Sequence, residues 1–170
     1  MALQKKICML GAFAVGKTSL VRRYVDSIFS DRYLTTVGVK IDKRIMTVDG
    51  SEVSLILWDI AGEDEISQVR TSYVRGAAGY LLVADGTRPG TVDVAQAIQQ
   101  RVEAEVGKLP CVVLLNKHDL HSLWSVSAEH IAALERAGWV VRLTSARSGE
   151  GVEEAFQALA ERVIASHQAR

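Results

Sequence analysis

One eight-residue segment constrains the fold more than any other part of the chain. Residues 11–18 read GAFAVGKT and fit the pattern G-x-x-x-x-G-K-[S/T]. A short apolar run over residues 5–10 precedes the segment, and apolar residues at helical spacing follow over residues 17–25. In this strand–turn–helix context, glycines let the backbone curl until several N–H groups converge on one anion. The pattern therefore predicts a phosphate-binding loop, and the alternative is a purely structural glycine-rich turn.

The residue types in this loop divide the expected chemistry between them. We expect Lys17 to bring a positive charge to the β- and γ-phosphates of a nucleotide. The Thr18 hydroxyl is a hard oxygen ligand of the kind that Mg²⁺ prefers. The N-terminus of the following helix adds its partial positive charge. The residues expected at the phosphates are Phe13, Ala14, Val15, Gly16, Lys17, Thr18 and Ser19.

Beyond this loop the chain reads as alternating strands and helices. Two strand-like segments are joined through Asp49-Gly50, a strong signal for a tight hairpin. The later strands are continuous apolar runs, which are typical of a parallel sheet covered on both faces. The prediction is one α/β domain over residues 1–170, with a mainly parallel sheet and one antiparallel strand. The expected strands after the hairpin span residues 79–84, 111–115 and 139–143, and the helices 92–106, 127–137 (capped by Ser127) and 152–165.

Charge and composition argue against several kinds of partner. The chain has 20 basic and 20 acidic residues, so its formal net charge is zero and no basic run favours nucleic acid. No apolar stretch approaches the roughly 18 residues of a spanning helix. Ala2 and the final HQAR sequence lack lipidation signals, so we expect no intrinsic membrane anchor. Cys8 and Cys111 are expected as free thiols rather than a disulfide or metal pair, which favours the cytoplasm.

A second polar segment indicates which base the nucleotide carries. Residues 116–119 read NKHD and follow a buried strand. The Asp119 carboxylate can accept two N–H bonds from guanine, whereas adenine presents an acceptor there, a mismatch worth roughly 10⁴-fold in discrimination. The Lys117 stem is expected along the base, and Asn116 is expected to tie this segment to the phosphate loop. An ordinary polar loop is the alternative. Backbone N–H groups after the last strand are expected at the guanine carbonyl, from Ser145, Ala146 and Arg147.

Together these segments resemble a Ras-superfamily small GTPase, closest to the Rab branch. The resemblance implies a six-stranded sheet flanked by five helices, in which Cys8 and Cys111 lie on non-adjacent strands. It also implies GTP or GDP as ligand, Mg²⁺ as cofactor, and a role as a molecular switch. The matching segments, in family order and at family spacing, are residues 11–18, 33–38, 58–62, 72–77, 116–119 and 144–147.

The same resemblance assigns roles to individual positions. Thr36 resembles the threonine that binds Mg²⁺ only when the γ-phosphate is present, and Asp59 resembles the aspartate linked to Mg²⁺. Gly62 resembles the switch glycine whose N–H contacts the γ-phosphate. Phe29 resembles the aromatic cover of the guanine, with a loop anchor as the alternative, and Tyr33 is counted with the nucleotide-binding residues. The implied metal set is Thr18, Thr36 and Asp59, and the implied catalytic set is Lys17, Thr36, Gly62 and Glu63.

Several positions depart from the family pattern. Glu63 stands where the family has the glutamine that orients the attacking water, and Phe13 stands where the family has glycine or another small residue. Ile60 replaces a threonine and Arg147 a lysine, the latter a mild change because only the backbone is needed there. The lipidated tail is missing, which suggests a bacterial protein or a truncated one, and we favour the bacterial origin.

These departures leave two functions open. The first is a GTP/GDP switch that hydrolyses GTP slowly, because ionised Glu63 cannot donate a hydrogen bond and Phe13 obstructs an arginine finger. The second is a GTP-binding scaffold with negligible hydrolysis. Asp119 disfavours an ATPase. An exchange factor or GTPase-activating protein is a possible regulator. The residues expected to meet a protein effector are Ile41, Trp58 and Tyr73, with ordinary core packing as the alternative.

Overall fold

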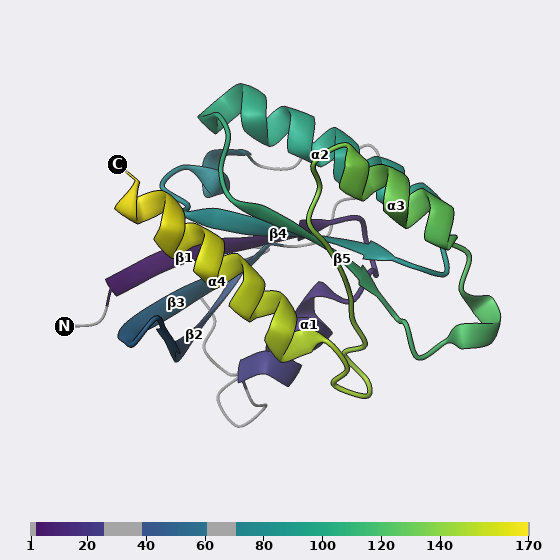
Figure 1. Ribbon diagram of the computed structural model, residues 1–170, viewed down its shortest axis with the longest axis horizontal. Helices are drawn as coiled ribbons and strands as arrows, with labels where there is room; N and C mark the ends of the chain where they lie inside the picture. The colour runs from purple at the N-terminus through teal and green to yellow at the C-terminus, as the bar shows by residue number, and fades with distance from the viewer. Residues whose placement is uncertain (1–2, 26–38, 61–70, 170) are drawn as a thin grey trace.

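The computed structural model describes residues 3–25, 39–60 and 71–169, and their centre is a twisted six-stranded sheet (Figure 1). The strand order is β2-β3-β1-β4-β5-β6, and every neighbouring pair is parallel except β2 and β3. This confirms the predicted α/β sheet with one antiparallel strand. The strands are β1 (Leu3–Gly11), β2 (Val39–Val48), β3 (Ser51–Ile60), β4 (Gly79–Asp85), β5 (Cys111–Asn116) and β6 (Val141–Leu143).

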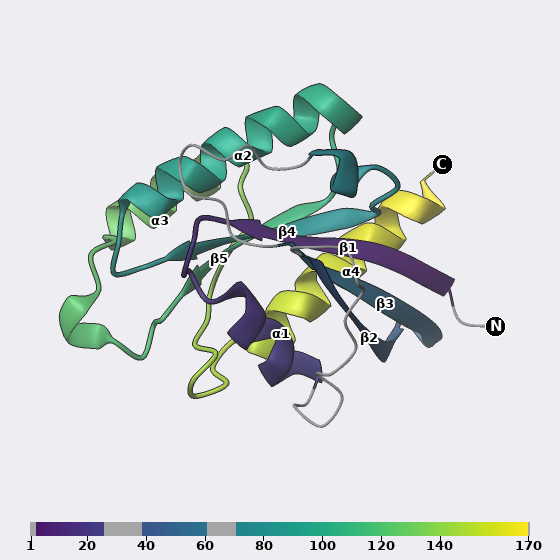
Figure 2. The same cartoon turned by 180° about the vertical axis from the view of Figure 1, so that it is seen from behind.

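Helices cover both faces of this sheet. In both views, α1 (Lys17–Val25) and α4 (Val152–Gln168) lie on one face, and α2 (Gly90–Val106) and α3 (Ala128–Arg136) lie on the other (Figures 1 and 2). The described residues therefore contain four α-helices, where the family resemblance implied five. Two short 3₁₀ helices, η2 (Thr71–Val74) and η3 (His121–Leu123), complete the described elements, and residues 61–70 lie outside them.

Local sequence signals account for two of the element boundaries. Asp49 and Gly50 both have positive φ, 49° and 79°, and Val48 pairs directly with Ser51. That backbone is the two-residue hairpin turn that an Asp-Gly pair favours, because glycine adopts positive φ without steric cost. At the start of α3 the Ser127 side chain accepts from the His130 N–H at 3.0 Å, as the predicted N-cap requires.

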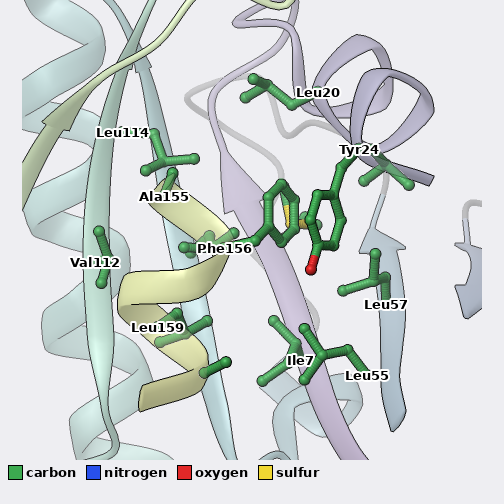
Figure 3. Packing of buried hydrophobic residues seen from close by; sticks show 14 of the residues in the cluster. Ile7, Leu20, Tyr24, Leu55, Leu57, Val112, Leu114, Ala155, Phe156 and Leu159 are labelled. Atoms are coloured by element: carbon green, nitrogen blue, oxygen red, sulfur yellow. The ribbon is translucent and has the colours of Figure 1, made fainter. Parts of the chain in front are cut away.

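The core is split by the sheet into two apolar layers. Side chains alternate along β1, so that Ile7 and Met9 join the layer under α1 and α4. In that layer the ring of Phe156 on α4 stacks on Tyr24 of α1, with centroids 3.9 Å apart and planes 2° apart (Figure 3). This stacking fixes α1 against α4 and so holds the loop that precedes α1.

The opposite layer contains Cys8, and the partly buried Cys111 packs against it. Cys8 and Leu10 of β1 face α2 and α3. Cys8 and Cys111 are both free, and their strands are separated by β4, which confirms that expectation. Burial raises the pKa of each thiol to about 12.

Because β1, β3, β4, β5 and β6 run parallel, their carboxyl ends meet at one side of the sheet, which we call the carboxyl edge.

Candidate functional site

The predicted phosphate loop, residues 11–18, joins β1 to α1 at the carboxyl edge. Its glycines are required by contact and by conformation. A Cβ on Gly11 would lie 2.3 Å from the Val83 carbonyl oxygen, and one on Gly16 (φ 102°) would lie 2.3 Å from Asn116 Nδ2. Ala14 adopts the left-handed region at φ 63°, which costs a residue with a Cβ about 1–2 kcal/mol. The loop is thus a curled and partly strained backbone held by its surroundings.

Lys17 lies inside this curl instead of extending into solvent. Only 5% of the residue is exposed, and its Nζ donates to the carbonyl oxygens of Gly11 at 3.2 Å and Ala12 at 3.4 Å. The Lys17 ammonium group therefore lies against the loop, where the loop N–H groups and the N-terminus of α1 also favour an anion. A nucleotide phosphate bound there would offer a stronger acceptor than either carbonyl.

Thr18 and Asp59 bring two hard oxygen groups together beside that charge. The Thr18 hydroxyl donates to Asp59 Oδ2 at 2.7 Å. Asp59 is buried near the end of β3, and burial raises its pKa, although the Thr18 hydrogen bond and the Lys17 charge oppose that rise. Within residues 3–25, 39–60 and 71–169 no three His, Cys, Asp or Glu side chains gather into a metal cluster. The pair fits Mg²⁺, which takes one or two protein oxygens together with phosphate oxygens and water.

Asn116 connects three loops at the carboxyl edge. Its Nδ2 donates to the Val15 carbonyl at 3.0 Å, which is the predicted tie to the phosphate loop. Its Oδ1 accepts from the Thr144 hydroxyl at 3.1 Å and from the Ala146 N–H at 3.3 Å. Because the Asn116 side chain is buried and has partners on both sides, residues 116–119 and 144–147 are held at a fixed distance from the phosphate loop.

Asp119 and Lys117 lie on the same loop as Asn116. Asp119 Oδ1 accepts from the Ser145 hydroxyl at 2.8 Å, and this hydrogen bond orients the carboxylate. Lys117 has φ 69°, and its Nζ donates to the Ala14 carbonyl at 3.0 Å. The Lys117 side chain therefore spans the distance between the two loops. A planar ligand over that span would meet the Lys117 stem on its face and Asp119 on its edge.

The remaining predicted contacts are divided between described and undescribed residues. Ser145 is buried, Ser19 and Arg147 are exposed, and the Arg147 carbonyl accepts from Arg23 Nη2 at 2.8 Å. Phe13 is 68% exposed. Five predicted site residues lie outside the described residues, namely Phe29, Tyr33, Thr36, Gly62 and Glu63.

The predicted effector-binding residues lie together on the β2–β3 side of the sheet. Ile41 pairs directly with Trp58 across the hairpin, and the Trp58 and Tyr73 rings are 6.4 Å apart. All three are partly buried against the core layer that contains Cys8. Lys6 Nζ lies 3.8 Å from the centre of the Trp58 ring. The three side chains form a continuous, partly exposed apolar strip.

Sequence reasoning missed two charged residues at this edge, Asp85 and Arg88. Asp85 ends β4, and its pKa falls to about 2: burial alone would raise it, but hydrogen bonds from Thr87, Lys117 and Arg88 outweigh burial. A charged residue at the end of an otherwise apolar strand is the only signal that the sequence offers for it.

Comparison with known proteins gives a consistent result over nearly the whole chain. A family model described as the Ras family matches residues 6–165. The Ras-related protein RabJ of Dictyostelium discoideum is 34% identical over 166 residues, and the match covers 96% of this chain and 64% of RabJ. The Ras-related protein Rab-7L1 of Rattus norvegicus is 34% identical over 169 residues, covering 94% of this chain and 81% of that protein.

A third relative, the Ras-related protein Rab-13 of Canis lupus familiaris, is 32% identical over 164 residues, covering 94% of this chain and 79% of that protein. The chain thus spans just under two thirds of RabJ and about four fifths of the other two relatives. In the described part of the chain, no helix has the length and hydropathy needed to cross a membrane.

Proposed function

We propose a working cycle for this chain, which belongs to the Ras family and is a small GTP-binding protein with GTPase activity. Members of this family bind GTP and GDP together with Mg²⁺. The proposed cycle has one nucleotide site at the carboxyl edge of a single domain, residues 1–170. GTP binds there, water attacks the γ-phosphorus, and GDP and phosphate result. The two nucleotide states would then present different surfaces to a protein effector.

One observation supports the placement of this site most strongly. Asn116 and Lys117 each hydrogen-bond a phosphate-loop carbonyl, at Val15 and Ala14 respectively. These two hydrogen bonds hold the segment that contains Asp119, the proposed base-selecting residue, in a fixed position relative to Lys17 and the loop N–H groups. A guanine nucleotide would meet a carboxylate at its base and a cation at its phosphates simultaneously, and adenine would leave Asp119 unpaired.

Thr18 and Asp59 are the described residues proposed to hold Mg²⁺. The ion would neutralise phosphate charge that the loop alone cannot balance. Thr18 would supply its hydroxyl oxygen directly, so its present hydrogen bond to Asp59 would be exchanged for the metal. Asp59 would act through a metal-bound water. Thr36 completes the proposed set.

The proposed reaction is slow, because two departures from the family pattern bear on it. An ionised Glu63 accepts a hydrogen bond from water but donates none to the γ-phosphate, and it adds negative charge beside that phosphate. The exposed ring of Phe13 would obstruct an arginine finger arriving from a partner protein. We therefore propose hydrolysis at or below the order of 10⁻⁴ to 10⁻³ s⁻¹, the rate range of unassisted Ras. The scaffold alternative is not favoured, given the family of the chain.

Single-turnover hydrolysis tests this proposal. Bound GTP should be converted to GDP slowly by the wild type and about tenfold faster by Glu63→Gln, since a glutamine can both accept from water and donate to phosphate. Glu52→Gln, which changes an exposed glutamate on β3, is the matched control and should leave the rate unchanged. A slower Glu63→Gln variant would instead identify Glu63 as a working base.

The proposed partner is a protein effector that contacts Ile41, Trp58 and Tyr73. Partly exposed aromatic residues are favoured anchors of protein interfaces, and here two of them lie side by side on one strip. Tyr73→Ala should weaken effector binding and leave GDP affinity intact; loss of folding in that variant would indicate a core role instead. A cytoplasmic location is part of the same proposal, supported by the two free thiols.

A further inference from the structure

A buried carboxylate outside all the predicted site residues binds two cations at the carboxyl edge. The side chain of Asp85 is 1% exposed. Its Oδ2 lies 3.0 Å from Arg88 Nε and 2.9 Å from Lys117 Nζ. Its Oδ1 accepts from the Thr87 N–H at 2.8 Å and from the Thr87 hydroxyl at 2.6 Å. Both carboxylate oxygens are thus occupied, as a buried charge requires.

Each of these cations also reaches the phosphate loop. Arg88 Nη2 donates to the Phe13 carbonyl at 3.0 Å, and Lys117 Nζ donates to the Ala14 carbonyl at 3.0 Å. Two consecutive peptide groups of the loop are therefore held by cations that share one anchor. Lys117 belongs to the predicted base-binding segment. Arg88 belongs to the β4–α2 turn, which lies outside every predicted segment.

The Arg88 backbone is itself held in place. The Arg88 N–H donates to the Asp85 carbonyl at 2.9 Å, and the Arg88 carbonyl accepts from the Thr91 N–H at 2.9 Å and the Thr91 hydroxyl at 2.7 Å. The next residue, Pro89, has a fixed φ and is the N-cap residue that directly precedes α2. The Arg88 side chain is 46% exposed, but its backbone and its ion-pair partner Asp85 are both held in place. Little side-chain conformational entropy is therefore lost when Arg88 keeps its hydrogen bond to the Phe13 carbonyl.

The position of these two carbonyls matters for anion binding. In a loop that directs its N–H groups at a phosphate, a carbonyl oxygen turned inward would repel the phosphate charge. The peptide groups around Ala14 are those most easily turned, because Ala14 has the strained left-handed backbone. Arg88 and Lys117 donate to the Phe13 and Ala14 carbonyls, and these hydrogen bonds lower the energy of the conformation in which both carbonyls point toward the cations and not into the anion site.

We propose that Arg88 is a positioning residue of the phosphate loop: anchored on Asp85, it holds the Phe13 carbonyl outward and thereby slows nucleotide release. Asp85 binds both Arg88 and Lys117, so the β4–α2 turn and the base-binding segment together hold the Phe13 and Ala14 carbonyls. This inference rests on the proposed function, since it concerns how the nucleotide site is held in shape.

Release of fluorescently labelled GDP from the Mg²⁺-loaded full chain tests the proposal. Arg88→Gln should release GDP about three- to tenfold faster, the range expected for loss of a charged hydrogen bond at a half-exposed site. Arg88→Lys, which keeps a cation near Asp85, should recover part of the loss. Arg75→Gln is the matched control, because Arg75 is an exposed arginine paired with Glu105 away from the site, and its release rate should equal that of the wild type.

Two further readouts separate positioning from a general loss of stability. The ratio of GDP affinity to GMP affinity, measured by competition with labelled GDP, should fall in Arg88→Gln, because the loop holds the β-phosphate that GMP lacks. In an Asp85→Asn background the same Arg88→Gln change should have a smaller effect, since the shared anchor is already weakened.

An Arg88→Gln variant that releases GDP at the wild-type rate, or that loses GMP and GDP affinity equally, would overturn the positioning role alone. A wild-type chain that retains no guanine nucleotide would overturn the proposed function and this inference with it. The two failures are therefore distinguishable in the same assay.

Discussion

Polar side chains at the carboxyl edge of the sheet are buried and hydrogen-bonded, whereas the opposite, amino edge is hollowed by a cavity. At the carboxyl edge, the buried polar side chains Asp59, Asp85, Asn116 and Ser145 each hydrogen-bond a neighbouring side chain or a loop carbonyl. The amino edge instead has an open cavity of about 750 Å³ between the ends of α2, α3 and α4. That cavity is lined by Gln99, Glu103, Lys108, Leu109, Pro110, Cys111, Ala137, Gly138, Trp139, Val140, Arg162, Ala165 and Ser166.

The comparison shows where this fold places its chemistry. In a parallel sheet the loops after successive strands meet at the carboxyl edge, so polar side chains distant in sequence converge there. Each buried polar group needs a partner, and a group that loses its partner costs about 1–3 kcal/mol. Substitutions at the carboxyl edge should therefore change ligand binding, whereas substitutions at the amino edge should change only packing.

The largest effect is expected at Asp119. Asp119→Ala removes the carboxylate proposed to accept from the guanine edge, so the preference for GDP over ADP should fall by about 10³-fold or more. Competition of each nucleotide with labelled GDP measures it. Asp93→Ala, which changes an exposed aspartate on α2, is the control and should keep the preference. Equal affinity of the wild type for GDP and ADP would refute the base assignment.

Removal of Mg²⁺ should have the next largest effect. Excess chelator should speed the release of labelled GDP on the order of tenfold or more, because Lys17 and the loop N–H groups then face the phosphate charge alone. Thr18→Ala should show a smaller response to chelator than the wild type, since its metal site is already impaired. Release that is unchanged in chelator would count against the Thr18–Asp59 site.

A moderate effect is expected from the acid titration of Asp85. Its pKa is about 2 in the folded protein, below the ordinary value of 3.8. The stability from this group is fully present above pH 4 and is lost as the pH falls through about 2. Asp85→Asn should therefore lower the free energy of unfolding by about 1–2 kcal/mol at neutral pH, and the difference should shrink below pH 4. Denaturant unfolding at several pH values measures it, and a difference that does not depend on pH would contradict the ion-pair account.

The smallest effect is expected at the amino edge. Cys111→Ala removes a partly buried thiol at the start of β5, so the free energy of unfolding should fall by about 1 kcal/mol. Release of labelled GDP should not change, because in the described part of the chain no residue that lines this cavity hydrogen-bonds the phosphate or base loops. Faster release in this variant would show that the two edges are coupled and would weaken the contrast between them.

The features of the fold that the sequence predicts correctly are those encoded by neighbouring residues. The Asp49-Gly50 hairpin, the Ser127 cap and the strand–turn–helix around residues 11–18 each depend on neighbouring residues, and each is present. The Asn116 tie was also anticipated, but through a recognised pattern rather than through local physics.

The role of Arg88 could not be foreseen in the same way. Its partner Phe13 is 75 positions away, and the contact exists only because β1 and β4 are neighbours in the sheet. The residues of the β4–α2 turn alone do not indicate that Arg88 contacts Phe13. The helix count is a second difference, with four α-helices in the described residues where the family pattern implied five. Roles assigned to Thr36, Gly62 and Glu63 stay predictions, since these residues lie outside the described part of the chain.

The most direct test of the central claim is the identity and fate of the nucleotide that the purified protein carries. Chromatography of the ligand released on denaturation should detect GDP or GTP and no adenine nucleotide, and loaded GTP should convert to GDP slowly in a single turnover. A protein that carries ATP or ADP, or that binds no nucleotide in the presence of Mg²⁺, would contradict the assignment of the carboxyl edge as a guanine-nucleotide site.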